Sequence, residues 1–114
     1  MAPEDETRDE TPVAVTDRPA EHRFEITYGD RLAGFTVYDE RPEGWAFVHT
    51  EIEPDLEGHG LASRLVRAAM DAMAERGTAV LPVCPYVRSW LIKHPDHLGV
   101  VPAEQRAAFD LPTA

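Results

Sequence analysis

Two glycines flank a histidine in the run Glu57-Gly58-His59-Gly60-Leu61-Ala62, directly before a stretch with helical periodicity. The first N–H groups of a helix have no acceptor within the helix, and the helix dipole favours negative charge at that end. Glycine lets the backbone approach a ligand that a Cβ would obstruct. A glycine turn alone is weak evidence. The order of strand, glycine turn and helix start, with Ile52 and Pro54 before the turn, predicts a site for a phosphate-bearing ligand.

Three further side chains carry groups suited to proton transfer or nucleophilic attack. Glu51 and His49 precede the glycine turn, where a carboxylate or an imidazole can accept a proton. Cys84 precedes Pro85 at an expected helix start, a place that favours a thiolate. Three roles stay open for Cys84: proton donor, nucleophile, and small buried apolar side chain. Glu51 and His49 also have purely structural interpretations: Glu51 can be a solvent-exposed charge on the strand, and His49 can be a buried core histidine.

The first half of the chain predicts an antiparallel meander that would position these groups. In residues 22–28 apolar and polar side chains alternate with the period of a half-buried strand. Gly29-Asp30 forms a two-residue hairpin connection to a second strand, residues 31–38. Residues 45–53 form the third strand. Strict alternation puts three of its side chains on one face, Phe47, His49 and Glu51, and three on the other, Val48, Thr50 and Ile52.

The second half of the chain predicts helices on this sheet, and therefore an α+β fold. Residues 60–76 form an amphipathic helix that ends at Gly77. Residues 78–83 form a buried strand, which can pair in parallel with residues 45–53 through a right-handed crossover. A second helix starts at Pro85 and ends before Pro95, and residues 101–109 form one more short helix.

Composition restricts the function classes. The 114 residues carry a net charge of −10, with no basic stripe, so we expect no nucleic-acid binding. An acidic surface is compatible with a cationic substrate. Residues 1–21 hold seven acids and no aromatic residue, and we interpret them as a disordered acidic tail before a domain at 22–110. No apolar run is long enough for a membrane span and no signal peptide is evident, so we expect a cytoplasmic location.

Metal binding is not expected from this sequence. His94 and His97 form the only close histidine pair, and Pro95 breaks the helix that would align them. Zinc would require more ligands at suitable spacing. His94 is better explained as a helix-end residue.

The run from Ile52 to Ala62 resembles the acetyl-coenzyme A motif of the GNAT N-acetyltransferases. In that motif an aliphatic strand end is followed by a proline and then by Arg/Gln-x-x-Gly-x-Gly/Ala at a helix start. Ile52, Pro54, Gly60 and Ala62 match the pattern, whereas Glu57 stands where the family has Arg or Gln.

The resemblance extends over about residues 24–98 and is strongest to the smallest single-domain branch of the family. That branch carries a histidine-threonine-glutamate strand, an E-G-x-G loop, a Cys-Pro-aromatic segment and a His-Pro pair. The corresponding segments here occur in the same order and are His49-Thr50-Glu51, residues 57–60, Cys84-Pro85-Tyr86 and His94-Pro95.

The resemblance implies a GNAT-like, mostly antiparallel sheet with two main helices. It also implies acetyl-coenzyme A bound where residues 45–53 and 78–83 diverge. The implied cofactor-binding residues are Ile52, Gly58, His59, Gly60, Leu61, Ala62 and Ser63. Larger members cover the acceptor site with two lid helices after the first strand. Only Gly29-Asp30 follows the first strand recognised here, so the acceptor cleft should be open, or completed by a second subunit in a homodimer or by the tail.

The resemblance also implies chemistry for the candidate catalytic residues Glu51, Cys84 and Tyr86. Backbone N–H groups near Ile52 would bind the thioester carbonyl, and Glu51 would be the base, assisted by His49. The tyrosine that usually acts as the acid is replaced by Trp90, which leaves Tyr86 or Cys84 as the proton donor.

Two functions from different classes follow. The first is direct N-acetylation of a small-molecule or peptide amine, and the second is a non-catalytic acyl-coenzyme A-binding module. The missing lid and Trp90 favour the second. Glu51 and Cys84 beside the expected thioester favour the first. No residue identifies the acceptor.

Overall fold

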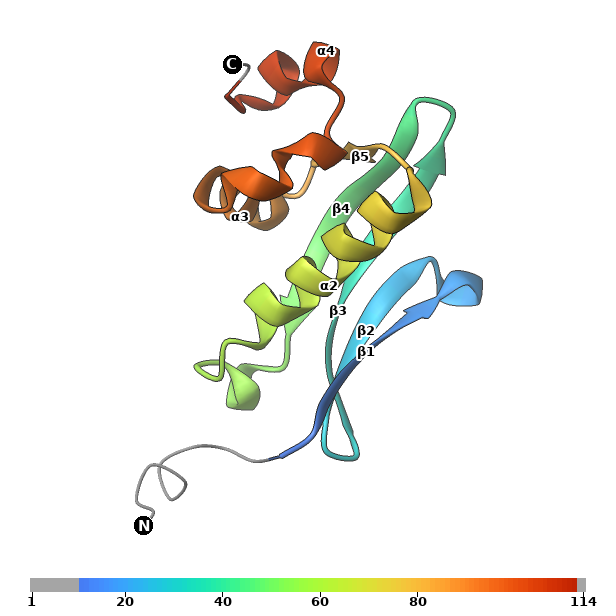
Figure 1. The fold of residues 1–114 in the computed structure, drawn as a ribbon. Helices are drawn as coiled ribbons and strands as arrows, with labels where there is room; N and C mark the ends of the chain where they lie inside the picture. Colours follow the sequence, from blue (N-terminus) through green and yellow to red (C-terminus); the bar gives the residue numbers. More distant parts are fainter. Residues whose placement is uncertain (1–10, 113–114) are drawn as a thin grey trace.

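One five-stranded sheet organises the computed structural model, which describes residues 11–112 (Figure 1). The strands lie in chain order. The first four are antiparallel and the fifth is parallel to the fourth. Their bounds are β1 Val13–Arg18, β2 Arg23–Tyr28, β3 Arg31–Arg41, β4 Gly44–Ile52 and β5 Val80–Leu81. The α+β class and the mostly antiparallel sheet predicted from the sequence are confirmed.

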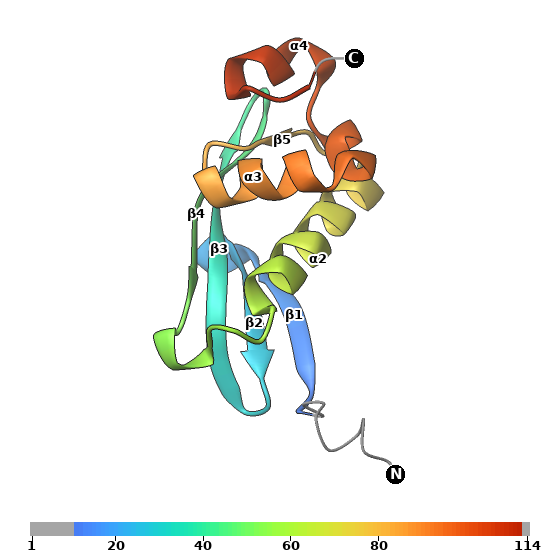
Figure 2. The same cartoon turned by 90° about the vertical axis from the view of Figure 1, so that its left-hand side faces the viewer.

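Two main helices pack on one face of the sheet, α2 (Leu61–Arg76) and α3 (Pro85–Lys93), and no described helix covers the other face (Figure 2). Helix α2 ends at Gly77, which adopts a left-handed conformation and donates its N–H to the last turn. The remaining elements are single turns or short helices: η1 Pro19–Glu21, η2 Pro54–Leu56, η3 Pro95–Val100, α4 Ala103–Arg106 and η4 Ala107–Phe109.

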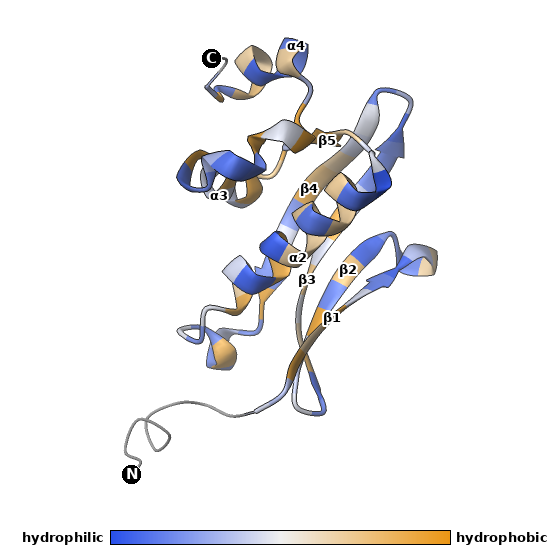
Figure 3. Ribbon diagram, viewed as in Figure 1, coloured by the Kyte–Doolittle hydropathy of each residue, from blue (hydrophilic) through white to orange (hydrophobic). Residues whose placement is uncertain are grey.

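The core lies between α2, α3 and the inner face of the sheet. Successive residues of β2 alternate between the two faces, visible as orange and blue bands along this strand (Figure 3). Phe24 and Ile26 of β2 pack with Leu65 and Met70 of α2, and all four are buried. The methionines of α2 therefore fill the core, as expected from their spacing.

Strand β1 corrects the interpretation of residues 1–21 as a disordered tail. Residues 13–18 pair antiparallel with β2 along the whole strand, so the boundary at residue 21 is wrong. Val13 and Val15 pack against the core. The acidic composition is overcome because the strand alternates, with Val13, Val15 and Asp17 turned toward α2. Residues 1–10, the remainder of the predicted tail, lie outside the described residues.

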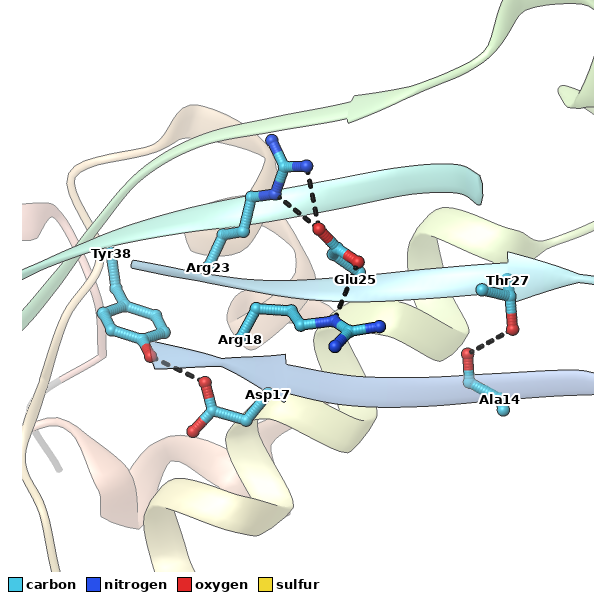
Figure 4. Close-up of polar contacts among 7 residues, drawn as sticks. All are labelled: Ala14, Asp17, Arg18, Arg23, Glu25, Thr27 and Tyr38. Carbon is cyan, nitrogen blue, oxygen red and sulfur yellow. Dashed lines mark hydrogen bonds and ion pairs between the residues drawn. The ribbon is translucent and has the colours of Figure 1, made fainter. Parts of the chain in front are cut away.

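Asp17 ties β1 to both layers of the domain. The buried Tyr38 hydroxyl donates to Asp17 Oδ1 at 2.6 Å (Figure 4). Arg76 Nη2 of α2 donates to Asp17 Oδ2 at 2.8 Å. Burial, followed by the bond to Asp17, raises the pKa of Tyr38 far above its ordinary value, so its hydroxyl remains a donor. On the opposite face of β1, Arg18 pairs with Glu25 in an exposed contact.

Asp17→Ala should lower the free energy of unfolding by about 1–3 kcal/mol, because the buried Tyr38 hydroxyl loses its acceptor. For a domain of this size that corresponds to a fall in Tm of roughly 10 °C. Arg18→Ala on the same strand is the matched control, since an exposed ion pair contributes at most about 1 kcal/mol. Thermal melts followed by circular dichroism would measure both, and equal losses would contradict the special position of Asp17.

A β-bulge in β4 corrects the predicted faces of this strand. The register with β3 shifts between the pairs Tyr38–Phe47 and Val37–His49, so β4 holds one extra residue there. Phe47 is buried in the core, whereas His49 is exposed on the outer face. The prediction that Phe47 shares a face with His49 and Glu51 is therefore wrong. Beyond the bulge, Thr50 is the residue that faces inward.

The connections between strands match the small size of the chain. Gly29-Asp30 links β2 to β3 as a hairpin, as predicted. Only η1 lies between β1 and β2, so no lid helix follows the first strand, and that connection rather than Gly29-Asp30 is the one to compare with larger relatives. Strand β5 is shorter than the predicted residues 78–83, but it runs parallel to β4 as expected.

Candidate active site

A pocket of about 380 Å³ opens where β4, the loop after it, and the first turns of α2 and α3 meet. Its lining consists of Thr50, Glu51, Ile52, Leu56, Glu57, Gly58, Gly60, Leu61, Ala62, Ser63 and Tyr86. Eight of the ten predicted site residues are among them. His59 and Cys84 are the two that do not line it.

The glycine turn presents an uncapped helix start to this pocket. Gly60 is the N-cap of α2, and no side chain caps the first turn. The first helical bond runs from Arg64 N to Gly60 O, so the N–H groups of residues 61–63 have no acceptor within the helix. The space that a Cβ would occupy at Gly58 or Gly60 is open. An uncapped start with open space around it fits the phosphate groups of coenzyme A.

Positive φ angles explain the two glycines more directly than crowding does. Gly58 has φ 95° and Gly60 has φ 71°, and side chains rarely adopt these conformations. The main role of the two glycines is therefore to allow the turn that directs the start of α2 toward the pocket. The ring of His59, between them, lies beside that of Tyr28 in a tilted arrangement, with ring centres 5.1 Å apart. Only its backbone belongs to the turn.

Strands β4 and β5 diverge beside the pocket. They pair only at Trp45–Val80 and Ala46–Leu81, and the bond from Cys84 N to Phe47 O at 2.7 Å follows immediately. Further along, Glu53 N donates to Ala33 O of the β3 side. Since neighbouring N–H groups of a strand point to opposite edges, the N–H of Ile52 points away from β3, toward the divergence. This is the edge where the predicted carbonyl contact would form.

Glu51 reaches the pocket from the outer face of the sheet. Its Oε1 lies 2.9 Å from His49 Nε2, and both side chains are more than half exposed. The ring of His49 also lies beside that of Phe35, with centres 6.3 Å apart. The pair joins a carboxylate to an imidazole at the pocket rim. His49 is therefore not the buried core histidine that the structural interpretation would require.

Tyr86 and Trp90 approach from α3. Tyr86 lines the pocket with 38% of its surface exposed, and burial raises the pKa of its hydroxyl, which therefore remains protonated and able to donate. Trp90 Nε1 donates to Ser63 Oγ at 2.9 Å, so the residue in the usual tyrosine position links α3 to the first turn of α2. Indole nitrogen is a donor only, which leaves the Ser63 hydrogen free of this bond.

Cys84 lies behind the pocket wall. It is the N-cap residue of α3 and only 4% exposed, and its thiol donates to Thr50 Oγ1 at 3.5 Å. Among the pocket residues, Thr50, Leu56 and Glu57 were not predicted as site residues. Thr50 was missed because strict alternation in β4 placed it on the wrong face. Its position between His49 and Glu51, in a segment that carries the family resemblance, was the feature of the sequence that could have identified it as a site residue.

A second pocket is larger, about 580 Å³, but lies at the other end of α2. Asp71, Asp96 and His97 are on its wall, and it contains none of the predicted site residues. His97 Nε2 bonds to Asp71 Oδ1 at 2.9 Å. His94 Nδ1 lies 2.7 Å from Trp90 O, which agrees with its interpretation as a helix-end residue. Volume alone does not make this the active site, because the glycine turn and the diverging ends of β4 and β5 lie at the smaller pocket.

Neither metal ligands nor membrane spans are seen in residues 11–112. No group of three or more His, Cys, Asp or Glu side chains in that range is arranged to hold a metal ion. No helix in the same range is long and apolar enough to cross a membrane.

Comparison with known proteins agrees with the geometry. The family described as GCN5-related N-acetyl-transferase matches residues 23–100, a span that includes every residue of the smaller pocket and excludes β1. No curated protein matches the chain. The family match covers more than half of the 114 residues. The chain therefore belongs to the family of GCN5-related N-acetyltransferases.

Proposed function

We propose that this chain transfers the acetyl group of acetyl-coenzyme A directly to an amine. The observation that carries the proposal is the smaller pocket, where an uncapped helix start, a free strand edge and a carboxylate meet. When bound, the co-substrate supplies a thioester-activated acetyl group. The N–H groups of residues 61–63 would hold its pyrophosphate, and the pantetheine arm would follow the edge of β4.

The chain's own residues supply the remaining steps. The N–H of Ile52 would polarise the thioester carbonyl from the edge of β4. Glu51 would take a proton from the attacking amine, and the imidazole of His49 at 2.9 Å would orient that carboxylate. Tyr86 would donate a proton to the leaving thiolate. Cys84 is an indirect alternative donor, because Thr50 separates its thiol from the pocket.

A cationic acceptor fits the surroundings of this site. Glu51 and Glu57 line the pocket. The carboxylate of Asp55, by contrast, is engaged by a bidentate contact with Arg31. Acidic side chains around the mouth attract protonated amines. We therefore propose primary amines, polyamines and peptide N-termini as the acceptor classes to test.

Glu51→Gln should lower kcat by roughly 10²–10⁴-fold while acetyl-coenzyme A still binds, because only the base is lost. Release of free coenzyme A thiol in the presence of each acceptor class measures the rate. Glu53→Gln is the matched control, since Glu53 does not line the pocket. Binding without any acceptor-dependent thiol release by the native chain would instead identify a non-catalytic acyl-coenzyme A-binding module. The absence of a hydroxyl on Trp90 is the observation that favours that alternative.

A further inference from the structure

Three small side chains connect the core to the pocket through hydrogen bonds. Thr36 of β3 and Thr50 of β4 are directly opposite each other, and their Oγ1 atoms lie 2.9 Å apart. The thiol of Cys84 donates to the same Thr50 oxygen at 3.5 Å. Thr36 is fully buried. Thr50 alone of the three lines the pocket.

The hydrogens in this cluster can be assigned from what each group is able to do. A hydroxyl has one hydrogen to donate and two lone pairs to accept. Within residues 11–112, the Thr50 oxygen is the one hydrogen-bond partner of the Thr36 hydroxyl. If Thr50 donated to Thr36, the Thr36 hydrogen would be buried without an acceptor, which is costly. Thr36 therefore donates to Thr50.

This assignment determines where the Thr50 hydrogen points. Thr36 and Cys84 both donate to Thr50 Oγ1, so its two lone pairs are occupied. The hydrogen of Thr50 must find an acceptor in a third direction. Since Thr50 lines the pocket and its two neighbours are behind it, that direction is the pocket itself. The protein thus holds a donor oriented toward the ligand before any ligand arrives.

We propose that the Thr50 hydroxyl is a hydrogen-bond donor to the thioester group of the bound acyl donor, and that Thr36 and Cys84 are positioning residues that orient it. The proposal rests on the proposed function for the identity of the ligand. Donors held in place by the fold stabilise negative charge that develops during acyl transfer, because they need no reorganisation when the reaction occurs. Thr50 supplements the N–H of Ile52 in this role.

The test compares two variants that differ only in the Thr50 hydroxyl. Thr50→Val alone would leave the Thr36 hydroxyl buried without a partner, so we use Thr36→Val and the double variant Thr36→Val/Thr50→Val. Replacing both partners of a buried hydrogen bond with apolar groups of the same shape is close to neutral for stability. Thr36→Val removes a positioning residue and should lower kcat by up to about tenfold, whereas the double variant, which also lacks the Thr50 hydroxyl, should lose roughly 10²–10³-fold in kcat. The single variant Thr50→Ser retains the hydroxyl and should keep most of the kcat of the native chain.

Binding provides a readout that does not depend on turnover. Relative to Thr36→Val, the double variant should bind acetyl-coenzyme A about fivefold more weakly, as expected for one net hydrogen bond. Both variants should bind adenosine 3′,5′-bisphosphate equally, because this probe lacks the thioester arm. Calorimetry measures both affinities. If the native chain shows no turnover but the double variant still loses affinity for acetyl-coenzyme A alone, the proposed function is contradicted and the role of Thr50 is supported.

Two results would overturn the role of Thr50. One is a folded double variant whose turnover and acetyl-coenzyme A affinity both equal those of Thr36→Val. The other is a Cys84→Ala variant that loses as much kcat as the double variant, which would make the thiol the essential donor.

Discussion

Gly60→Asp is expected to abolish binding of coenzyme A while the domain stays folded. The carboxylate would stand at the uncapped start of α2, in the open space where we place the pyrophosphate. Two like charges about 4 Å apart near a protein surface repel by about 4 kcal/mol. That corresponds to a loss of affinity of about 10³-fold. The fold should tolerate the change, because aspartate adopts positive φ more readily than most residues and suits a helix N-terminus.

Gly60→Asn is the matched control, since asparagine has the same shape and the same tolerance of positive φ but no charge. Acetyl-coenzyme A should raise the Tm of the native chain, as any ligand of the folded state does. It should raise the Tm of the asparagine variant less, and it should leave that of the aspartate variant unchanged. A full shift in the aspartate variant would place the phosphate site elsewhere than at the start of α2.

Deletion of residues 1–20 is expected to destabilise the domain by at least about 3 kcal/mol. The deletion removes β1, and with it the acceptor of the buried Tyr38 hydroxyl and the packing of Val13 and Val15. Against a total stability of about 5–15 kcal/mol, such a loss lowers Tm by well over roughly 10 °C and leaves some molecules unfolded at ambient temperature. Composition alone would have predicted almost no effect.

Deletion of residues 1–10 is the control for this experiment, because it keeps the whole of β1. Urea unfolding of both truncations gives the midpoint and the slope for each. An equal loss of stability in the two truncations would assign the effect to residues before β1. No loss of stability on deletion of residues 1–20 would show that β1 is dispensable.

The sequence predicted those elements whose determinants are local. Helix α2 follows from its apolar spacing and from Gly77, and α3 is bounded by Pro85 and Pro95. The hairpin at Gly29-Asp30 follows from its turn residues. The glycine turn and its uncapped helix start depend on a few adjacent residues, which is why most of the pocket lining could be named in advance. The family resemblance was carried by these same short segments.

Tertiary structure decided the features that depend on residues far apart in the chain. Strand β1 forms because β2, Tyr38 and Arg76 supply its partners. These partners lie outside residues 1–21, so the composition of that segment cannot indicate them. The bulge in β4 arises from register with β3 and not from any breaker residue within β4.

That bulge also decided the site. By reversing which side chains of β4 face inward, it separates Glu51 and His49 from the core and brings Thr50 between the pocket and Cys84. Residue types and spacing are enough to predict a phosphate cradle, because its groups are neighbours along the backbone. The direction of a single hydroxyl hydrogen is set by buried partners on β3 and α3, and only the folded chain brings these together.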